Sequence, residues 1–165
     1  MLLANILLAL AWAALQGRFS LANLAMGWIL GYLILLLLVK GGVLGPSRYV
    51  GRLSRFVGLA VYFLWELVLA NLRVALDVAT PRYHMTPGIV RLPLDAKSDA
   101  EILLLAALIN LTPGSVALDV SDDRRVMYVH VMYIQTPDRA RAEIKEGFER
   151  RVLDLLRGGP ESERA

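Results

Sequence analysis

The chain has 165 residues, two histidines, no cysteine and a formal charge of +3. The absence of cysteine excludes a disulfide framework, a thiolate nucleophile and a cysteine-ligated metal or cluster, and two histidines are few for a metal site. The small positive charge comes without a basic stripe interleaved with aromatic residues, which argues against a nucleic-acid partner.

Charged residues are distributed unevenly along the chain. Arg18 is the only charged side chain before Lys40, whereas most acidic and basic residues follow Pro81. A soluble domain with so few charges in its first quarter would have trouble covering its surface with polar groups. The sequence therefore predicts a membrane region over residues 1–80, a small soluble domain over residues 81–157 and a flexible tail over residues 158–165.

Two apolar stretches open the chain. Residues 21–39 are free of charge and close to the ~20 residues that a spanning helix needs, and residues 2–15 form a shorter run. A signal peptide is the alternative interpretation of the first run, but no basic segment precedes it and a second apolar run follows almost at once. We expect a helical hairpin across the bilayer.

The second of these helices carries a glycine pair. Gly27 and Gly31 have GxxxG spacing, and Asn23 lies one four-residue step earlier on the same face. Small residues at this spacing let two helix backbones approach closely, which favours association in lipid. Glycine is also common in membrane helices, so the spacing could equally arise without any role in packing. We expect this face to pack against a neighbouring subunit.

A basic segment over residues 40–55 follows the hairpin. It contains four cationic residues and no acidic residue, and Gly41, Gly42 and Gly45-Pro46 predict a loop. Short basic loops stay in the cytoplasm. This places the N-terminus on the cytoplasmic side as well, in a multi-pass membrane protein.

The third apolar stretch, residues 56–79, is predicted to be helical and carries Glu66, Arg73 and Asp77. At 100° per residue these three fall with Arg55 within about 40° on one face. If the helix spans the bilayer, Glu66 is a costly mid-membrane carboxylate and a candidate for the ion path. If the helix lies at the cytoplasmic interface, the polar stripe meets headgroups and water.

The number of membrane crossings distinguishes these two arrangements, because it decides on which side of the membrane the C-terminal half lies. Two crossings with an interfacial third helix keep the basic segment and the C-terminal half in the cytoplasm, and we favour this arrangement. Arg73 and Asp77 are spaced for an i,i+4 pair, which leaves Glu66 to pair with another subunit or with an ion in transit. The candidates for subunit packing or the ion path are Gly27, Gly31, Glu66, Asn71, Arg73 and Asp77.

The soluble half has the pattern β-α-β-β-α, typical of a small α+β module with helices on one face of a mixed or antiparallel sheet. The expected elements are strands at 89–94, 116–120 and 126–134 and helices at 99–111 and from Pro137 to about residue 157. Pro93 suits an edge strand, and Ser98 with Glu101 forms a capping box. Residues 99–111 are apolar but too short to span a bilayer, which favours a buried core helix.

Little in the soluble half suggests chemistry. Thr112, Pro113 and Gly114 favour a structural helix stop over an anion-binding nest of amides. His130 is predicted on a largely apolar strand face, which indicates a core or interface residue rather than a proton carrier. The sequence contains no nucleotide-binding, nucleophile-elbow or metal-protease motif. We therefore expect neither an enzyme nor a cofactor.

Several segments together resemble a known family. They are residues 110–115 (NLTPGS), 118–120 (LDV), 128–130 (YVH), 66–67 with 70–71 (EL and AN), and 87–90 with Leu94. This pattern resembles the E subunit of multisubunit Mrp-type cation/proton antiporters over about residues 1–155. The resemblance implies an accessory subunit needed for assembly and activity of a complex that exchanges Na+ and H+. It also implies large polytopic and small membrane subunits as partners.

From the residues alone, a second function remains open. A stand-alone, membrane-anchored binding or scaffold module would show the same hairpin and soluble domain. Co-purification separates the two, because a transporter subunit is recovered with larger membrane proteins and an anchored module is recovered alone.

Overall fold

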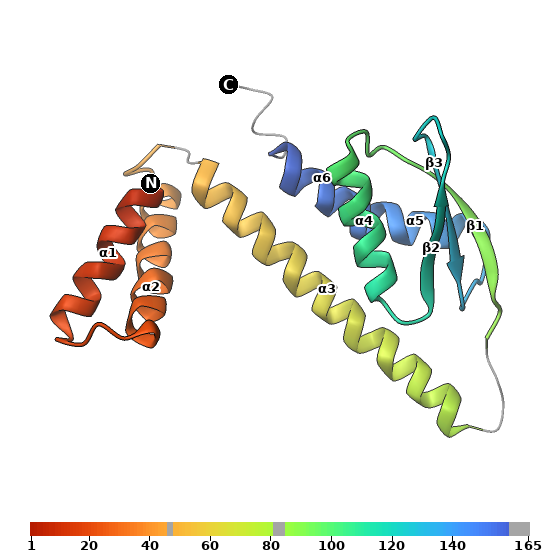
Figure 1. Cartoon of the computed structure of the whole chain (residues 1–165), viewed down its shortest axis with the longest axis horizontal. Coiled ribbons are helices and arrows are strands. Elements are labelled where there is room, and N and C mark those ends of the chain that lie inside the picture. Colours follow the sequence, from red (N-terminus) through yellow and green to blue (C-terminus); the bar gives the residue numbers. More distant parts are fainter. Residues whose placement is uncertain (46–47, 81–84, 159–165) are drawn as a thin grey trace. The chain divides into compact units, whose positions relative to one another are not determined.

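The computed structural model describes residues 1–45, 48–80 and 85–158 (Figure 1). The chain forms two compact units, Met1–Ser54 and Arg55–Ala165, and the division falls inside helix α3 (Arg48–Ala79). The division falls there because α3 contributes Leu59 to the hydrophobic core of the C-terminal unit. The boundary expected at residue 80, between a membrane region and a soluble domain, stays a prediction.

The first unit is built on the expected hairpin. Helix α1 (Leu2–Leu15) and helix α2 (Leu21–Lys40) match the predicted ranges within one residue. The turn is tight because Gly17 adopts a φ of +63°, and the Ser20 hydroxyl caps α2 by accepting a hydrogen bond from the Asn23 amide at 3.2 Å. Among the described residues, α2 and the stretch Tyr49–Ala79 are long and apolar enough to cross a membrane.

Helix α3 begins eight residues earlier than expected. Arg52 and Arg55, which the sequence pattern assigned to a loop, lie on this helix. The glycine pair at residues 41–42 and the Gly45-Pro46 break precede residue 47, and the single Gly51 after them weakens a helix without ending it. The basic segment is therefore partly helical, and α3 is 32 residues long.

The second unit contains a three-stranded antiparallel sheet in the order β1-β3-β2. Strand β1 (Gly88–Pro93) lies at an edge, and β3 (Val126–Val131) pairs with both β1 and β2 (Ser115–Val120). Strand β3 ends three residues before the expected Ile134, because the chain there forms a single parallel bridge between Tyr133 and Thr86.

Helix α4 (Asp99–Leu111) begins at the predicted capping box, in which Ser98 and Glu101 each bind the other's backbone amide. The core interpretation of this helix is confirmed, since Leu105 and Ile109 are 0% and 1% exposed. They pack against the inner face of the sheet, where Met127 and Val129 are fully buried.

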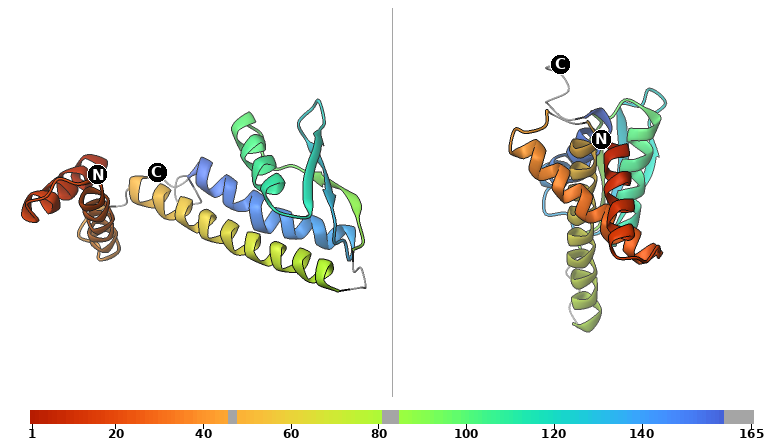
Figure 2. Two further views of the ribbon diagram at one scale, coloured as in Figure 1. Left: turned by 60° about the horizontal axis from the view of Figure 1, so that its bottom comes forward. Right: turned by 90° about the vertical axis from the view of Figure 1, so that its left-hand side faces the viewer.

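The C-terminal helical rod, as we call residues 137–157, consists of α5 (Pro137–Ile144), a π-helical turn (Lys145–Glu149) and α6 (Arg150–Arg157). The sequence predicted one uninterrupted α-helix here, and the π-helical turn corrects that expectation. The start after Thr136 and the stop at Gly158, which has a φ of +100°, are as expected. Figure 2 (left) shows the rod running alongside α3.

Candidate membrane and subunit interfaces

The polar stripe of α3 is directed at the C-terminal module, as we call the sheet and helices of residues 85–158. Near its start, the Arg55 guanidinium donates a hydrogen bond to the carbonyl of Gly158, just after α6. Near its end, the Asp77 carboxylate accepts a hydrogen bond from the Tyr133 hydroxyl at 2.6 Å. Two points of α3 separated by six turns are thus tied to one small module.

Aromatic packing joins the middle of the stripe to the rod. The Tyr62 ring meets Phe148 edge to face, with 5.4 Å between ring centroids, and the Arg151 guanidinium lies 3.8 Å above the Tyr62 ring. The Tyr62 hydroxyl occupies the space that a side chain at residue 147 would need, so a Cβ on Gly147 would overlap it. The lack of a side chain at Gly147 therefore leaves room for the Tyr62 hydroxyl.

Glu66 lies one turn after Tyr62 and is half-buried. Its carboxylate interacts with the Tyr62 hydroxyl, so a polar neighbour within the chain is available to it. The sequence pattern left Glu66 with no partner on its own helix. The sequence analysis missed this partner, because a tyrosine in a membrane helix is usually interpreted as a residue at the membrane–water boundary.

The remaining polar candidates of α3 occupy separate places. Asn71 is exposed, and its amide donates back to the carbonyl of Leu67 at 2.7 Å. The Asp77 carboxylate accepts the hydrogen bond from Tyr133, and its expected pair with Arg73 stays a prediction. That bond raises the pKa of the Tyr133 phenol, because the carboxylate holds its proton, while Arg73 opposes the shift.

Arg73 lines a polar cleft between α3 and the start of the rod. The cleft is completed by Thr86, Tyr133, Gln135, Arg139, Ala140 and Glu143. Arg139 is already bound to Glu143 at 3.1 Å and to Gln135 at 2.6 Å. No group of three or more histidines, aspartates or glutamates among the described residues could hold a metal ion.

The face of α3 opposite the stripe is apolar and exposed. Its side chains have between 47% and 82% of their surface accessible, and they are Phe56, Val57, Val61, Leu64, Trp65, Val68, Leu72, Leu76 and Val78. A contiguous apolar surface of this kind marks a contact with another protein or with lipid.

The glycine pair of α2 packs against α1 of the same chain. A Cβ on Gly27 would lie 2.9 Å from the backbone of Ala9 and from the Cβ of Trp12, and one on Gly31 would overlap Asn5 Oδ1. Both glycines are buried inside the hairpin. The expectation that this face contacts another subunit is therefore corrected, because α1 occupies it.

Asn5 is a buried polar residue that sequence reasoning missed. It is 0% exposed, and its amide donates to the Tyr49 hydroxyl at 2.9 Å. Its Oδ1 has no conventional donor in the described part of the chain and rests against Gly31, where Cα–H groups are available. The signal was present, since Asn5 is the one strongly polar side chain in residues 1–15.

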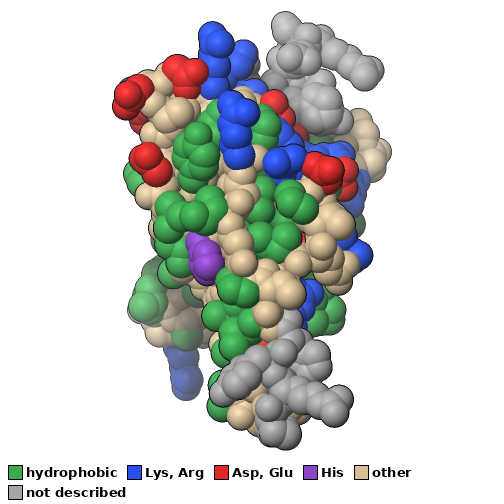
Figure 3. All heavy atoms as spheres, turned by 90° about the vertical axis from the view of Figure 1, so that its right-hand side faces the viewer, with side chains coloured by type: hydrophobic (Ala, Val, Ile, Leu, Met, Phe, Trp, Pro, Cys, Tyr) green, Lys and Arg blue, Asp and Glu red, His purple; other side chains and the backbone are tan. Residues whose placement is uncertain are grey.

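His130 lies on the outer face of the sheet, opposite the core. The strand register places it between Ile89 on β1 and Val116 on β2, which are 64% and 46% exposed. Figure 3 shows hydrophobic side chains gathered, together with a histidine, on the surface of this side of the molecule. The role of His130 in an interface remains a prediction, and the face is open in the isolated chain.

The predicted helix stop at residues 112–114 has the geometry of a cap. Thr112 ends α4, its hydroxyl donates to the Leu108 carbonyl at 2.9 Å, and Gly114 has a φ of +87°. The side chain of Asn110 accepts a hydrogen bond from the Ala117 amide at 2.7 Å, which ties the helix end to β2. These contacts account structurally for the NLTPGS segment.

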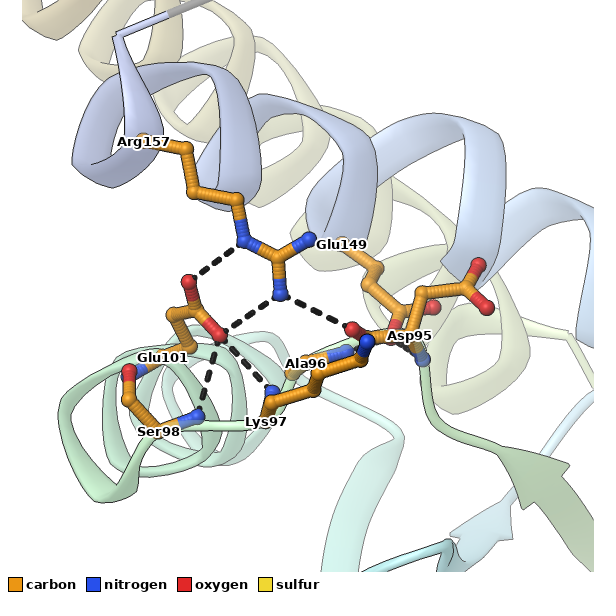
Figure 4. A network of polar contacts seen from close by, with 7 residues as sticks. All are labelled: Asp95, Ala96, Lys97, Ser98, Glu101, Glu149 and Arg157. Atoms are coloured by element: carbon orange, nitrogen blue, oxygen red, sulfur yellow. Dashed lines mark hydrogen bonds and ion pairs between the residues drawn. The ribbon is translucent and has the colours of Figure 1, made fainter.

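A buried ionic network secures the loop before α4 (Figure 4). Glu101 accepts hydrogen bonds from Arg157 at 2.7 and 2.9 Å and from the Lys97 and Ser98 amides. Arg157 holds the pKa of Glu101 down to about 2, although burial opposes this shift.

Glu149 forms the second half of this network. This carboxylate is 1% exposed and accepts from the amides of Asp95 and Ala96 at 2.6 and 3.0 Å. Lys145 binds both Glu149 and Asp95. Burial acts to lower the pKa of Lys145, but these two carboxylates raise it above its ordinary value. Glu149 is thus buried although it lies in a run of charged residues along the rod.

Comparisons with known proteins agree along nearly the whole chain. Residues 5–155 match the family model described as Na+/H+ ion antiporter subunit. The chain is 33% identical to the E subunit of the Na+/H+ antiporter of Alkalihalophilus pseudofirmus and 35% identical to that of Bacillus subtilis. Each match covers 94% of this chain and 98% of the relative. The chain belongs to the family of Na+/H+ antiporter E subunits.

Two solved membrane complexes contain chains similar to this member of the E-subunit family. A chain of the archaeal membrane-bound sulfane sulfur reductase is 26% identical with a TM-score of 0.55, over 94% of this chain and 98% of that one. A chain of the Mrp complex from Dietzia is 29% identical with a TM-score of 0.45, over 62% of this chain and 94% of that one.

Proposed function

We propose that this chain is the E subunit of a multisubunit monovalent cation/proton antiporter of the cell membrane. The match to antiporter E subunits over almost its full length carries this conclusion. Its partners are the other subunits of the antiporter, large and small, and the transported Na+ and H+ are handled by the complex.

We further propose that the role of the chain is structural. The ends of the α3 stripe are engaged within the module, at Gly158 and Tyr133, and Glu66 has the Tyr62 hydroxyl beside it. Charged groups used in this way support a fold more readily than they conduct an ion. The chain accordingly performs no catalytic chemistry, and it contributes to assembly and, through assembly, to transport.

The proposed topology has two crossings. The rod that packs along α3 carries many charged residues, among them Glu143, Lys145 and Arg151. If α3 crossed the bilayer with the module folded against it, these charges would enter the hydrocarbon, at a cost of several kcal/mol each. We therefore place α3 in the cytoplasmic interface and the module in the cytoplasm, on the same side as the basic segment.

Affinity purification of the tagged chain from its native membrane tests the function. The antiporter assignment predicts recovery with the larger membrane subunits in fixed proportion. Recovery of a folded, monodisperse chain alone would support the alternative, an anchored binding or scaffold module.

The role of Glu66 is testable in the same preparation. Glu66→Gln removes the charge and keeps the shape, so a structural role predicts weaker assembly with transport reduced in proportion to the complex lost. Glu146→Gln, an exposed position on the rod, is the matched control. Full assembly of Glu66→Gln with abolished exchange, or with a shifted pH optimum, would place Glu66 in the ion path instead.

A further inference from the structure

A groove of about 510 Å³ lies between α3 and α6. Leu59, Val61 and Trp65 of α3 supply apolar walls, and Arg55 and Arg151 supply two guanidinium groups. Asp154 is the one acidic residue in the lining, so cationic groups outnumber it. The groove thus combines an apolar trough with a cationic end.

The two arginines are not equally satisfied. Arg151 donates to the carbonyls of Glu146 and Gly147 at 2.9 and 2.8 Å and covers the Tyr62 ring. Arg55 donates through one terminal nitrogen to Gly158, but its Nε–H group is buried without an acceptor among the residues that the structure describes. A buried donor of this kind needs an acceptor, and a phosphate oxygen is well suited to a guanidinium group.

The surroundings of the groove favour a lipid over a soluble anion. Its α3 wall continues into the exposed apolar face, where Phe56, Val61 and Trp65 are 55%, 61% and 61% accessible. In the sequence, residues 40–55, which end at Arg55 of the groove, contain four cations and no acidic residue. Apolar surface bordered by cations is the combination that attracts amphipathic segments to anionic membranes.

We propose that this groove binds an anionic phospholipid, with the phosphate at Arg55 and Arg151 and the upper acyl chain along Leu59 and Trp65. The inference depends on the membrane position proposed above for α3. The lipid completes the Arg55 hydrogen bonding and covers part of the apolar face. It thereby fixes the module on the bilayer surface.

Fluorescence quenching of Trp65 tests this directly. The full chain with Trp12→Phe and Trp28→Phe keeps Trp65 as its single tryptophan. In vesicles, brominated phosphatidylglycerol should quench Trp65 more than brominated phosphatidylcholine at equal mole fraction. The expected preference is roughly fivefold per arginine engaged, from ~1 kcal/mol per basic residue at an anionic surface.

Substitutions distinguish lipid binding in this groove from general attraction of anionic lipid to surface charge. Arg55→Gln should remove most of the preference and Arg55→Lys should keep part of it, since lysine retains the charge without the guanidinium geometry. Arg150→Gln, exposed on α6 and outside the groove lining, should leave the preference unchanged. Equal quenching by both lipids, or equal losses in Arg55→Gln and Arg150→Gln, would overturn the proposal.

Two further measurements keep the test independent of folding and of the assigned function. Phospholipid retained by the purified complex should lose phosphatidylglycerol selectively in Arg55→Gln, and unchanged lipid content would refute the site. If inorganic phosphate alone abolished the preference for phosphatidylglycerol, the groove would be a site for a free anion and the lipid proposal would be refuted. Co-purification of the unmutated chain with the large subunits tests the proposed function separately, and recovery of that chain alone would count against the function and not against the lipid site.

Discussion

Replacing Gly27 with alanine should loosen the α1–α2 hairpin. The new Cβ would lie 2.9 Å from Ala9 Cα, from Ala9 O and from Trp12 Cβ, whereas ordinary van der Waals contact lies at 3.4–4 Å. Two of these atoms belong to backbone, so the helices must separate by about half an ångström. Overpacking of this kind costs ~1–3 kcal/mol. The better helix propensity of alanine offsets at most ~1 kcal/mol.

The assay is thermal unfolding of the purified full-length chain in mild detergent, without other subunits. Gly27→Ala should lower the midpoint, whereas Gly58→Ala should not, because nothing lies within 4 Å of a Cβ on Gly58. An unchanged midpoint for Gly27→Ala, together with loss of co-purification, would refute the reasoning. Gly27 would then face another subunit, as the sequence alone suggested.

Three further predictions concern the module. Gly147→Ala should destabilise it by ~1–3 kcal/mol because the Cβ meets the Tyr62 hydroxyl, and adding Tyr62→Phe should restore much of the loss in urea unfolding. The ionised form of Glu101 contributes stability above pH 4.5 that is lost as pH falls toward its folded pKa of about 2. Because Arg157→Gln removes the partner that lowers this pKa, the unfolding midpoint of the variant should fall less than that of the parent chain as the pH is lowered from 4.5 toward 2. Tyr133→Phe removes the hydrogen bond to Asp77 at a half-exposed site and should cost under ~1.5 kcal/mol in the same assay.

Local patterns were sufficient to predict most elements of the fold. The charge-free run of residues 21–39, the capping box at Ser98 and the stop at Gly158 are signals that act within a few residues. The helix and strand ranges therefore agree closely with the structure. The start of α3 was missed because the glycines and the proline up to residue 46 were interpreted together with the following basic residues as one loop.

The partners of the α3 stripe could not be predicted in the same way. Arg55 and Gly158 are 103 residues apart in sequence, and Asp77 and Tyr133 are 56 apart. Helical periodicity identified the stripe as one face but carries no information on what covers it. The same holds for Glu149, whose amide partners at Asp95 and Ala96 lie more than fifty residues away.

The glycine pair shows how a correct pattern leads to a wrong partner. GxxxG spacing indicates close helix packing, and the structure has close packing at Gly27 and Gly31. The sequence pattern alone assigned that packing to another subunit, although the nearest apolar helix in the chain, α1, was within reach of a five-residue turn. Asn5 on α1, which the sequence analysis did not single out, lies against Gly31 in this contact.

In the proposed topology, α3 lies in the cytoplasmic interface and holds the C-terminal module in the cytoplasm. Because the chain has no cysteine, single-cysteine variants report topology without further changes. Gln16→Cys lies in the hairpin turn and Asp122→Cys at the exposed tip between β2 and β3. With an impermeant thiol reagent on intact cells, we predict labelling at position 16 and none at position 122 until the membrane is permeabilised. Labelling at position 122 in intact cells would establish a third crossing and exclude the two-crossing topology.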